Sequence, residues 1–169
     1  MTPVELSHSK IVYDLQNSEQ IFQKVGDGII TKNPALVPSV TVADCVPIYL
    51  YDEVTKVFGI VHSGWKGTGI IKEAIMLANQ KYGSAPSDFC VVIGPHINDC
   101  CYVVNEERAT YFAKEFTPDC VKPISKNQKI DWNNGEGQLF SLSLLKANLS
   151  VLEKIGVTEG GILTVSKEN

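Results

Sequence analysis

The sequence has few of the residues from which metal and nucleophile sites are built. It contains three histidines and five cysteines in 169 residues. It has no CxxC pair and no HExxH helix motif, the two spacings that most strongly indicate a zinc site. Only a small number of ligand or nucleophile constellations can therefore be built from this chain.

Long apolar runs and clusters of basic residues are also lacking. No segment approaches the roughly 18 apolar residues of a membrane helix, and the start MTPVELSHSK lacks the basic and apolar regions of a secretory signal. The net charge of −4 is a poor match for a phosphate backbone. Five cysteines, with Cys100 and Cys101 adjacent, disfavour a disulfide framework. We therefore expect a cytoplasmic protein with reduced thiols and neither nucleic acid nor membrane as a partner.

The chain length and composition predict a single domain over 1–169. With 44% hydrophobic residues, the chain can bury one sizeable core. Runs rich in Val, Ile, Tyr and Thr predict strands at 10–15, 28–31, 37–43, 46–52, 57–62 and 89–94. Apolar periodicity predicts helices at 68–82, from Asn105 to Pro118 and from Ser141 to Gly156. The segment 123–138 is expected to be an exposed loop. The fold class predicted is α+β (mixed α/β), with a sheet buried under helices.

Three side chains at predicted strand ends form a candidate metal site. Cys45 joins two strand-like runs, and His62 closes the next strand 17 positions later. A hairpin over 46–62 would bring imidazole and thiol together, and His8 precedes another strand. Three such ligands with a fourth position open are typical of catalytic zinc. The alternative is a buried, inert cysteine beside two ordinary histidines.

The glycine-rich segment SGWKGTG (63–69) lies between a strand end and a helix start. Backbone N–H groups and the helix dipole favour an anion at such a turn, and Lys66 adds positive charge. The segment does not fit the P-loop pattern GxxxxGK[ST]. The alternative is a tight turn in which Trp65 serves as a packing anchor.

The segment IGPHINDCCYVV (93–104) contains further candidates. His96 follows a buried strand, in a position where loops often hold functional groups or where it is simply exposed. Cys100 and Cys101 cannot both face the same side of an extended segment. The roles of these three residues stay open.

Three aspartates complete the candidates: Asp27, Asp44 and Asp52. Each could orient a ligand histidine or transfer a proton. Each could equally cap a turn.

Three segments resemble the laccase-domain (multicopper polyphenol oxidase) family, whose members are regarded mainly as purine nucleoside phosphorylases. They are VTVADCVPIYLYD, GIVHSGWKG and VVIGPHINDCCYVV, preceded by SHSKIV and GDGIIT. The match runs through nearly the whole chain. The resemblance implies an α/β/β/α layered fold with mixed sheets, unlike the cupredoxin barrels of true laccases.

The resemblance also implies a site and an activity. Catalytic zinc, with copper as a possible substitute in some preparations, would be bound by His8, Cys45 and His62, which are thereby the expected catalytic residues. The family's reactions are phosphorolysis of purine nucleosides and deamination of adenosine, and some relatives are assigned to editing of peptidoglycan precursors. The segment beside the metal is expected to bind substrate and phosphate through Ser63, Gly64, Lys66, Gly67 and Asp44.

The chain departs from the family pattern at several positions. Leu6 replaces a glutamine, Lys66 replaces an arginine, and Val103 replaces a glutamate. The chain also starts later and stops earlier than typical members, so we expect a domain shortened at both ends. Two further readings stay open: a metal-free hydrolase with Cys45 as nucleophile and His62 as base, or a non-catalytic relative. A monomer or small homo-oligomer is expected.

Overall fold

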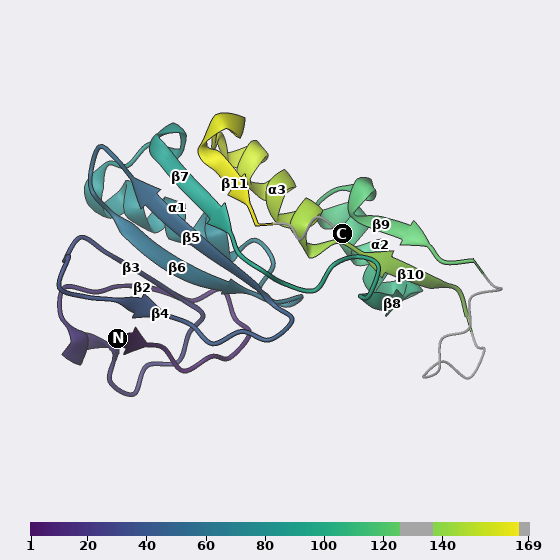
Figure 1. The fold of residues 1–169 in the computed structure, drawn as a ribbon, viewed down its shortest axis with the longest axis horizontal. Helices are drawn as coiled ribbons and strands as arrows, with labels where there is room; N and C mark the ends of the chain where they lie inside the picture. Colours follow the sequence, from purple (N-terminus) through teal and green to yellow (C-terminus); the bar gives the residue numbers. More distant parts are fainter. Residues whose placement is uncertain (126–136, 166–169) are drawn as a thin grey trace.

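A six-stranded mixed sheet forms the centre of the molecule (Figure 1). The computed structural model describes residues 1–125 and 137–165. The strand order is β11-β7-β5-β6-β3-β2, with parallel pairs at the two ends and antiparallel pairs between them. The strands are β2 (Val12–Asp14), β3 (Gly28–Thr31), β5 (Val46–Asp52), β6 (Phe58–Ser63), β7 (Phe89–Ile93) and β11 (Ile162–Thr164).

The helices and two smaller sheets surround this central sheet. The helices are α1 (Ile70–Tyr82), α2 (Glu106–Glu115) and α3 (Leu144–Ile155). The two-stranded sheet consists of β1 (Thr2–Pro3) and β4 (Pro38–Ser39). The three-stranded sheet has the order β8-β10-β9 and consists of β8 (Val103–Asn105), β10 (Leu139–Leu142) and β9 (Val121–Pro123). The three-stranded sheet and α2 lie together at one end of the elongated molecule (Figure 1).

The two faces of the central sheet have separate hydrophobic cores. Successive side chains of a strand point to opposite faces, and adjacent residues of β3 show this directly. Ile30 packs into the main core with residues of α1 and α3, whereas Ile29 packs with Val4, Leu15 and Leu36 under the N-terminal segment. The mixed α/β class predicted from the sequence is confirmed.

The hairpin of β5 and β6 determines where the site forms. Its register pairs Val46 with Ser63 and Pro47 with His62. The turn is closed by Asp52, whose carboxylate accepts hydrogen bonds from the backbone N–H groups of Val54 (2.7 Å) and Thr55 (3.1 Å). The predicted hairpin is thus confirmed, and its open end places Cys45 beside the end of β6.

Several predicted boundaries differ from the structure. The run 37–43 pairs only at Pro38–Ser39, and α1 begins at Ile70 rather than at residue 68. The third helix begins at Leu144 because residues up to Leu142 belong to β10 and Ser143 caps the helix through the N–H of Lys146. The expected loop at 123–138 falls mostly on 126–136, which lies outside the described residues. In the described part of the chain, every helix is too short or too polar to cross a membrane.

Candidate metal centre

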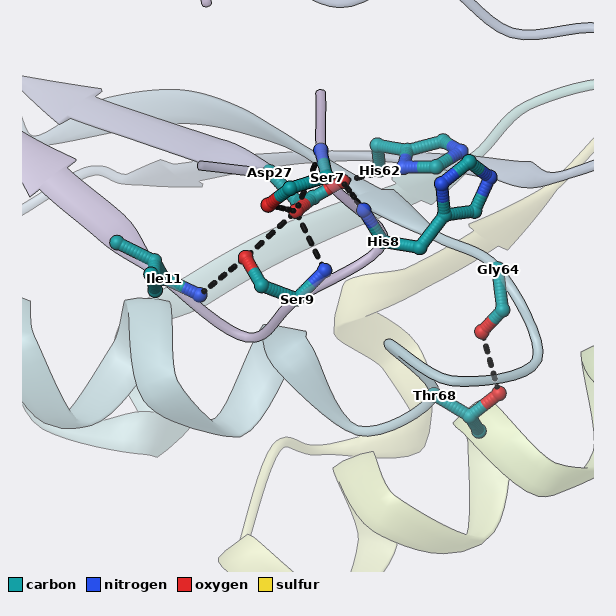
Figure 2. Close-up of polar contacts among 8 residues, drawn as sticks. All are labelled: Ser7, His8, Ser9, Ile11, Asp27, His62, Gly64 and Thr68. Carbon is teal, nitrogen blue, oxygen red and sulfur yellow. Dashed lines mark hydrogen bonds and ion pairs between the residues drawn. The ribbon is translucent and has the colours of Figure 1, made fainter. Parts of the chain in front are cut away.

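The three predicted ligands converge at the open end of the β5–β6 hairpin. Ligand atoms of His8, Cys45 and His62 all lie within 4.8 Å of one another. The centroids of the two imidazoles are 5.0 Å apart, with the rings edge to face. Figure 2 shows the two rings next to each other on the same side of the β6 end. His62 is buried, Cys45 is half-buried and His8 is exposed, so the cluster is open to solvent on the His8 side.

Asp27 orients one ligand ring and holds the segment of another. Its fully buried carboxylate is 2.8 Å from Nδ1 of His62 and accepts a hydrogen bond from the backbone N–H of His8 at 2.9 Å. It also accepts bonds from the N–H and hydroxyl of Ser9, both at 2.6 Å (Figure 2). With Nδ1 of His62 directed at a carboxylate, Nε2 is left for a metal.

The pKa values of the Asp27 carboxyl and the Cys45 thiol are shifted in opposite directions. Burial raises the pKa of Asp27, but hydrogen bonds from Ser9, His62 and His8 outweigh it, so the pKa lies below its ordinary value. Burial raises the pKa of the Cys45 thiol, and the charges of Asp44 and Asp27 raise it further. A thiol in this setting is not activated as a free nucleophile, whereas a bound metal ion would deprotonate it.

Gly64 leaves the space that the three ligands need. A Cβ at this position would lie 3.0 Å from Sγ of Cys45 and 3.3 Å from Cδ2 of His8. Contacts this short are tight for a Cβ atom, so the ligand side chains would have to shift by a few tenths of an ångström to admit any other residue. His8 itself has a φ of 58°, a left-handed conformation that is uncommon for histidine and whose strain is often found at functional sites.

The remaining residues of the predicted anion turn have different surroundings. The hydroxyl of Ser63 is buried and donates to Oδ1 of Asn148 at 3.0 Å. Thr68 closes the turn by donating to the carbonyl of Gly64 at 2.9 Å. Gly67 packs against the Ser9 carbonyl, and Lys66 is exposed. That Ser63, Gly64, Lys66 and Gly67 contact phosphate stays a prediction.

The other candidates lie outside the trio. Asp44 is exposed beside Cys45, while Asp52 caps the hairpin turn at the far end of β5. Nδ1 of His96 is 2.7 Å from the carbonyl oxygen of Gly94. Cys100 and Cys101 are exposed, with Sγ atoms 3.2 Å apart. In the described segments, the cluster of His8, Cys45 and His62 is the one group of three or more such side chains positioned for a metal.

The donor set fits a transition-metal ion with an open coordination position. Ligand atoms around tetrahedral zinc are about 3.5 Å apart, given Zn–S and Zn–N lengths. The ligand atoms lie within 4.8 Å of one another, a looser arrangement than this, so the three side chains would draw together around an ion. Two imidazoles and one thiolate leave one tetrahedral position for water or substrate, which distinguishes catalytic from structural sites. The carboxylate–histidine pair supplied by Asp27 is the usual support of a metal-bound histidine.

The fold and the site together define a class of protein: a mixed α/β domain that carries a His-Cys-His cluster supported by an aspartate. The chain belongs to the family described as multi-copper polyphenol oxidoreductase laccase, whose sequence profile matches residues 1–168. The predicted resemblance is therefore confirmed.

Relatives in sequence and in structure agree with this assignment. The chain is 38% identical over 127 residues to a purine nucleoside phosphorylase of Clostridium acetobutylicum, covering 74% of this chain and 52% of that protein. It is 34% identical over 148 residues to a purine nucleoside phosphorylase of Borreliella burgdorferi, covering 85% and 63%. The crystal structure of a Bacillus licheniformis hypothetical protein, YfiH, matches with a TM-score of 0.83 at 27% identity, covering 98% of this chain and 63% of that one. The chain thus spans between half and two thirds of these relatives.

Proposed function

We propose that this protein is a zinc-dependent purine nucleoside phosphorylase that also deaminates adenosine. The observation that carries the proposal is the convergence of His8, Cys45 and His62 within 4.8 Å beside the glycine turn. The printed names of the relatives support the substrate class. Purine nucleosides and phosphate would be the partners.

The three clustered side chains would hold the metal, with Asp27 fixing the orientation of His62. Zinc, when bound, supplies a Lewis acid and lowers the pKa of a coordinated water. The exposure of His8 leaves the cluster accessible to a nucleoside from the solvent side. In the described part of the chain, the backbone N–H groups of Lys66 and Gly67 donate to no backbone carbonyl, and in this proposal they would donate to phosphate or ribose oxygens.

Phosphorolysis requires a phosphate oxygen to attack C1′ of the ribose as the bond to the purine nitrogen breaks. The purine leaves with a proton, and ribose 1-phosphate forms. The turn 63–67 would hold the phosphate next to the metal cluster, and Asp44, which is exposed and adjoins Cys45 in sequence, would accept hydrogen bonds from ribose hydroxyls. In deamination, the oxygen of water replaces the amino group of adenosine and ammonia is released.

An assay with adenosine and phosphate tests the proposal. Zinc-loaded protein should release adenine and ribose 1-phosphate by phosphorolysis and inosine by deamination. The Cys45→Ala variant should release none of these products. Metal analysis of both proteins accompanies the assay, so that loss of zinc is separated from loss of chemistry. Absence of adenine, inosine and ribose 1-phosphate with zinc present would refute the activity. Nucleoside binding by calorimetry without conversion would instead identify a non-catalytic relative.

One observation favours a second candidate, a metal-free Cys-His hydrolase. Cys45, His62 and Asp27 lie in the order of a nucleophile, a base and the group that orients the base. The raised pKa of the Cys45 thiol opposes this reading, because catalytic cysteines need a lowered one. Iodoacetamide separates the two candidates: a zinc-bound Cys45 should be alkylated only after a chelator is added, whereas a free nucleophile reacts in either case.

A further inference from the structure

Two cationic side chains gather on the indole ring of Trp65, next to the metal cluster. The guanidinium carbon of Arg108 lies 4.0 Å from the ring centroid, and Nζ of Lys66 lies 5.3 Å from it. Lys66 follows Trp65 in the turn after β6, whereas Arg108 comes from the first turn of α2, more than 40 positions further along the chain. The fold therefore brings two positive charges from separate elements to one aromatic platform.

The position of Arg108 is held from two sides. Its backbone N–H donates to Oδ1 of Asn105, the N-cap of α2, at 3.0 Å. The guanidinium carbon, 4.0 Å from the ring centroid, is within the range of a favourable cation–π contact. A guanidinium carries five N–H donors, so the hydrogen bond of Arg108 with Tyr102 leaves the other donors for a planar or tetrahedral anion.

Neither cation is neutralised by an acidic side chain. In the parts of the chain that the structure describes, no carboxylate oxygen lies within 4.0 Å of Arg108 or Lys66. Arg108 is half-buried and Lys66 is exposed. An unpaired guanidinium with restricted freedom loses less entropy on binding an anion than a mobile surface arginine does.

This platform adjoins the metal cluster. Trp65 directly follows Gly64, whose Cα hydrogens point towards Sγ of Cys45 and the ring of His8. Tyr102 links the two regions: burial raises the pKa of its hydroxyl, the charge of Arg108 and a hydrogen bond with it lower the pKa, and the charges of Cys45 and Asp44 raise it. The guanidinium of Arg108 and the thiol of Cys45 therefore both lie within electrostatic range of the Tyr102 hydroxyl.

We propose that Arg108 and Lys66, assembled on Trp65, bind the phosphate co-substrate, with Arg108 providing the bidentate contact. This inference rests on the proposed phosphorylase function and identifies the anion subsite of the same site. Lysine is a point charge and cannot form a two-pronged contact with phosphate. Arg108 would supply that contact from α2, across the indole ring from the turn.

Phosphate binding to the zinc-loaded protein, measured by calorimetry without nucleoside, tests the proposal. Arg108→Gln should weaken the binding of inorganic phosphate by about 10- to 100-fold, which is the expected effect of losing a charge-assisted bidentate contact. Arg108→Lys keeps the charge and loses the fork, so it should bind more weakly than wild type and more tightly than Arg108→Gln. Lys114→Gln is the matched control, because Lys114 is exposed near the other end of α2 and its loss changes the net charge equally.

Turnover separates this inference from the function on which it rests. Arg108→Gln should raise the KM for phosphate while leaving the KM for nucleoside unchanged. Arg108-dependent phosphate binding without release of purine would uphold the anion site and defeat the phosphorylase proposal. Purine release with an unchanged phosphate KM in Arg108→Gln, or equal weakening by Lys114→Gln, would overturn the role of Arg108. Circular dichroism of each variant confirms that the fold is retained.

Discussion

At the scale of single residues, one carboxylate links the two histidines of the candidate metal centre. Asp27 contacts Nδ1 of His62 through the same oxygen that accepts the N–H of His8. Its other oxygen accepts hydrogen bonds from the backbone N–H and hydroxyl of Ser9, three positions before β2 begins at Val12. Because His8 lies on an otherwise exposed segment, its imidazole depends on Asp27 for its place beside β6.

Asp27→Asn should weaken zinc binding by about 10- to 100-fold, the usual cost of losing a carboxylate that orients a metal-bound histidine. The amide keeps one acceptor oxygen and turns an NH₂ group towards donors that need an acceptor. Competition with a chromogenic chelator measures the affinity. Asp52→Asn is the matched control, since Asp52 is also fully buried but caps a turn away from the cluster. Equal zinc affinities for the two variants would contradict the role given to Asp27.

Gly64→Ala should also reduce zinc affinity, because its new methyl group would lie 3.0 Å from Sγ of Cys45 and 3.3 Å from the His8 ring. The ligands must then move apart, which opposes a shared ion. Gly160→Ala serves as the control, since a Cβ there meets nothing within 4 Å. Zinc content after dialysis distinguishes the variants. A Gly64→Ala protein with wild-type zinc content would show that the ligands can relax around the methyl group.

The residues of the candidate site differed in how far the sequence could predict them. Cys45 and His62 were predictable because a hairpin has a simple register, and the structure confirms that hairpin. Asp27 could not be separated from Asp44 and Asp52 by sequence, because its importance comes from contacts with segments 18 to 35 positions away. No sequence pattern indicated Arg108, because its contact with Trp65 depends on how α2 packs against the turn after β6.

At the scale of elements, the end of β6 is tied to α3 by one buried hydrogen bond. The hydroxyl of Ser63 donates to Oδ1 of Asn148, whose side-chain NH₂ donates in turn to the carbonyl of Leu144 at 2.8 Å. Both Ser63 and Asn148 are fully buried. The helix therefore fixes the strand end that carries His62.

Ser63→Ala should lower the free energy of unfolding by about 1 to 3 kcal/mol, because it leaves the buried Asn148 oxygen without a donor. Urea unfolding of the metal-free protein measures the change, and Ser87→Ala, at an exposed position, should be close to neutral. Zinc stoichiometry should be retained in Ser63→Ala. A neutral effect on stability, accompanied by a weaker phosphate affinity, would show that the hydroxyl is available to phosphate instead.

At the scale of the whole molecule, local patterns predicted five strands of the central sheet but missed β11 and the three-stranded sheet at the end of the molecule. Helices α1 and α2 end or begin at Gly83 and Asn105, which the sequence marks as caps. The β8-β10-β9 sheet consists of strands of three or four residues, and β10 pairs with Val103–Asn105 from more than 30 positions earlier. Such short strands contain too few residues to show an alternation of apolar and polar side chains, so the sequence pattern does not predict them.

The acid stability of the whole molecule should depend on its buried carboxylates. Burial raises the pKa of Asp52, but hydrogen bonds from Ser84, Thr55 and Val54 outweigh it and lower the pKa below its ordinary value of 3.8. A carboxyl with a lower pKa in the folded state stabilises that state at pH values above the unfolded pKa, and this contribution is lost as the pH falls through the folded pKa. The metal-free protein should therefore lose stability below about pH 4.

The matched pair Asp52→Asn and Glu53→Gln tests this dependence, since Glu53 is the exposed neighbour in the same turn. Asn cannot ionise, so the difference in unfolding free energy between wild type and Asp52→Asn should be largest near neutral pH and should shrink as acid protonates Asp52 in the wild type. Urea unfolding of the metal-free proteins from pH 7 down to about pH 3 gives that difference directly. Glu53→Gln should track the wild type over the whole range. A difference for Asp52→Asn that stays constant with pH would mean that hydrogen-bond geometry alone, and not the charge of Asp52, stabilises the hairpin turn.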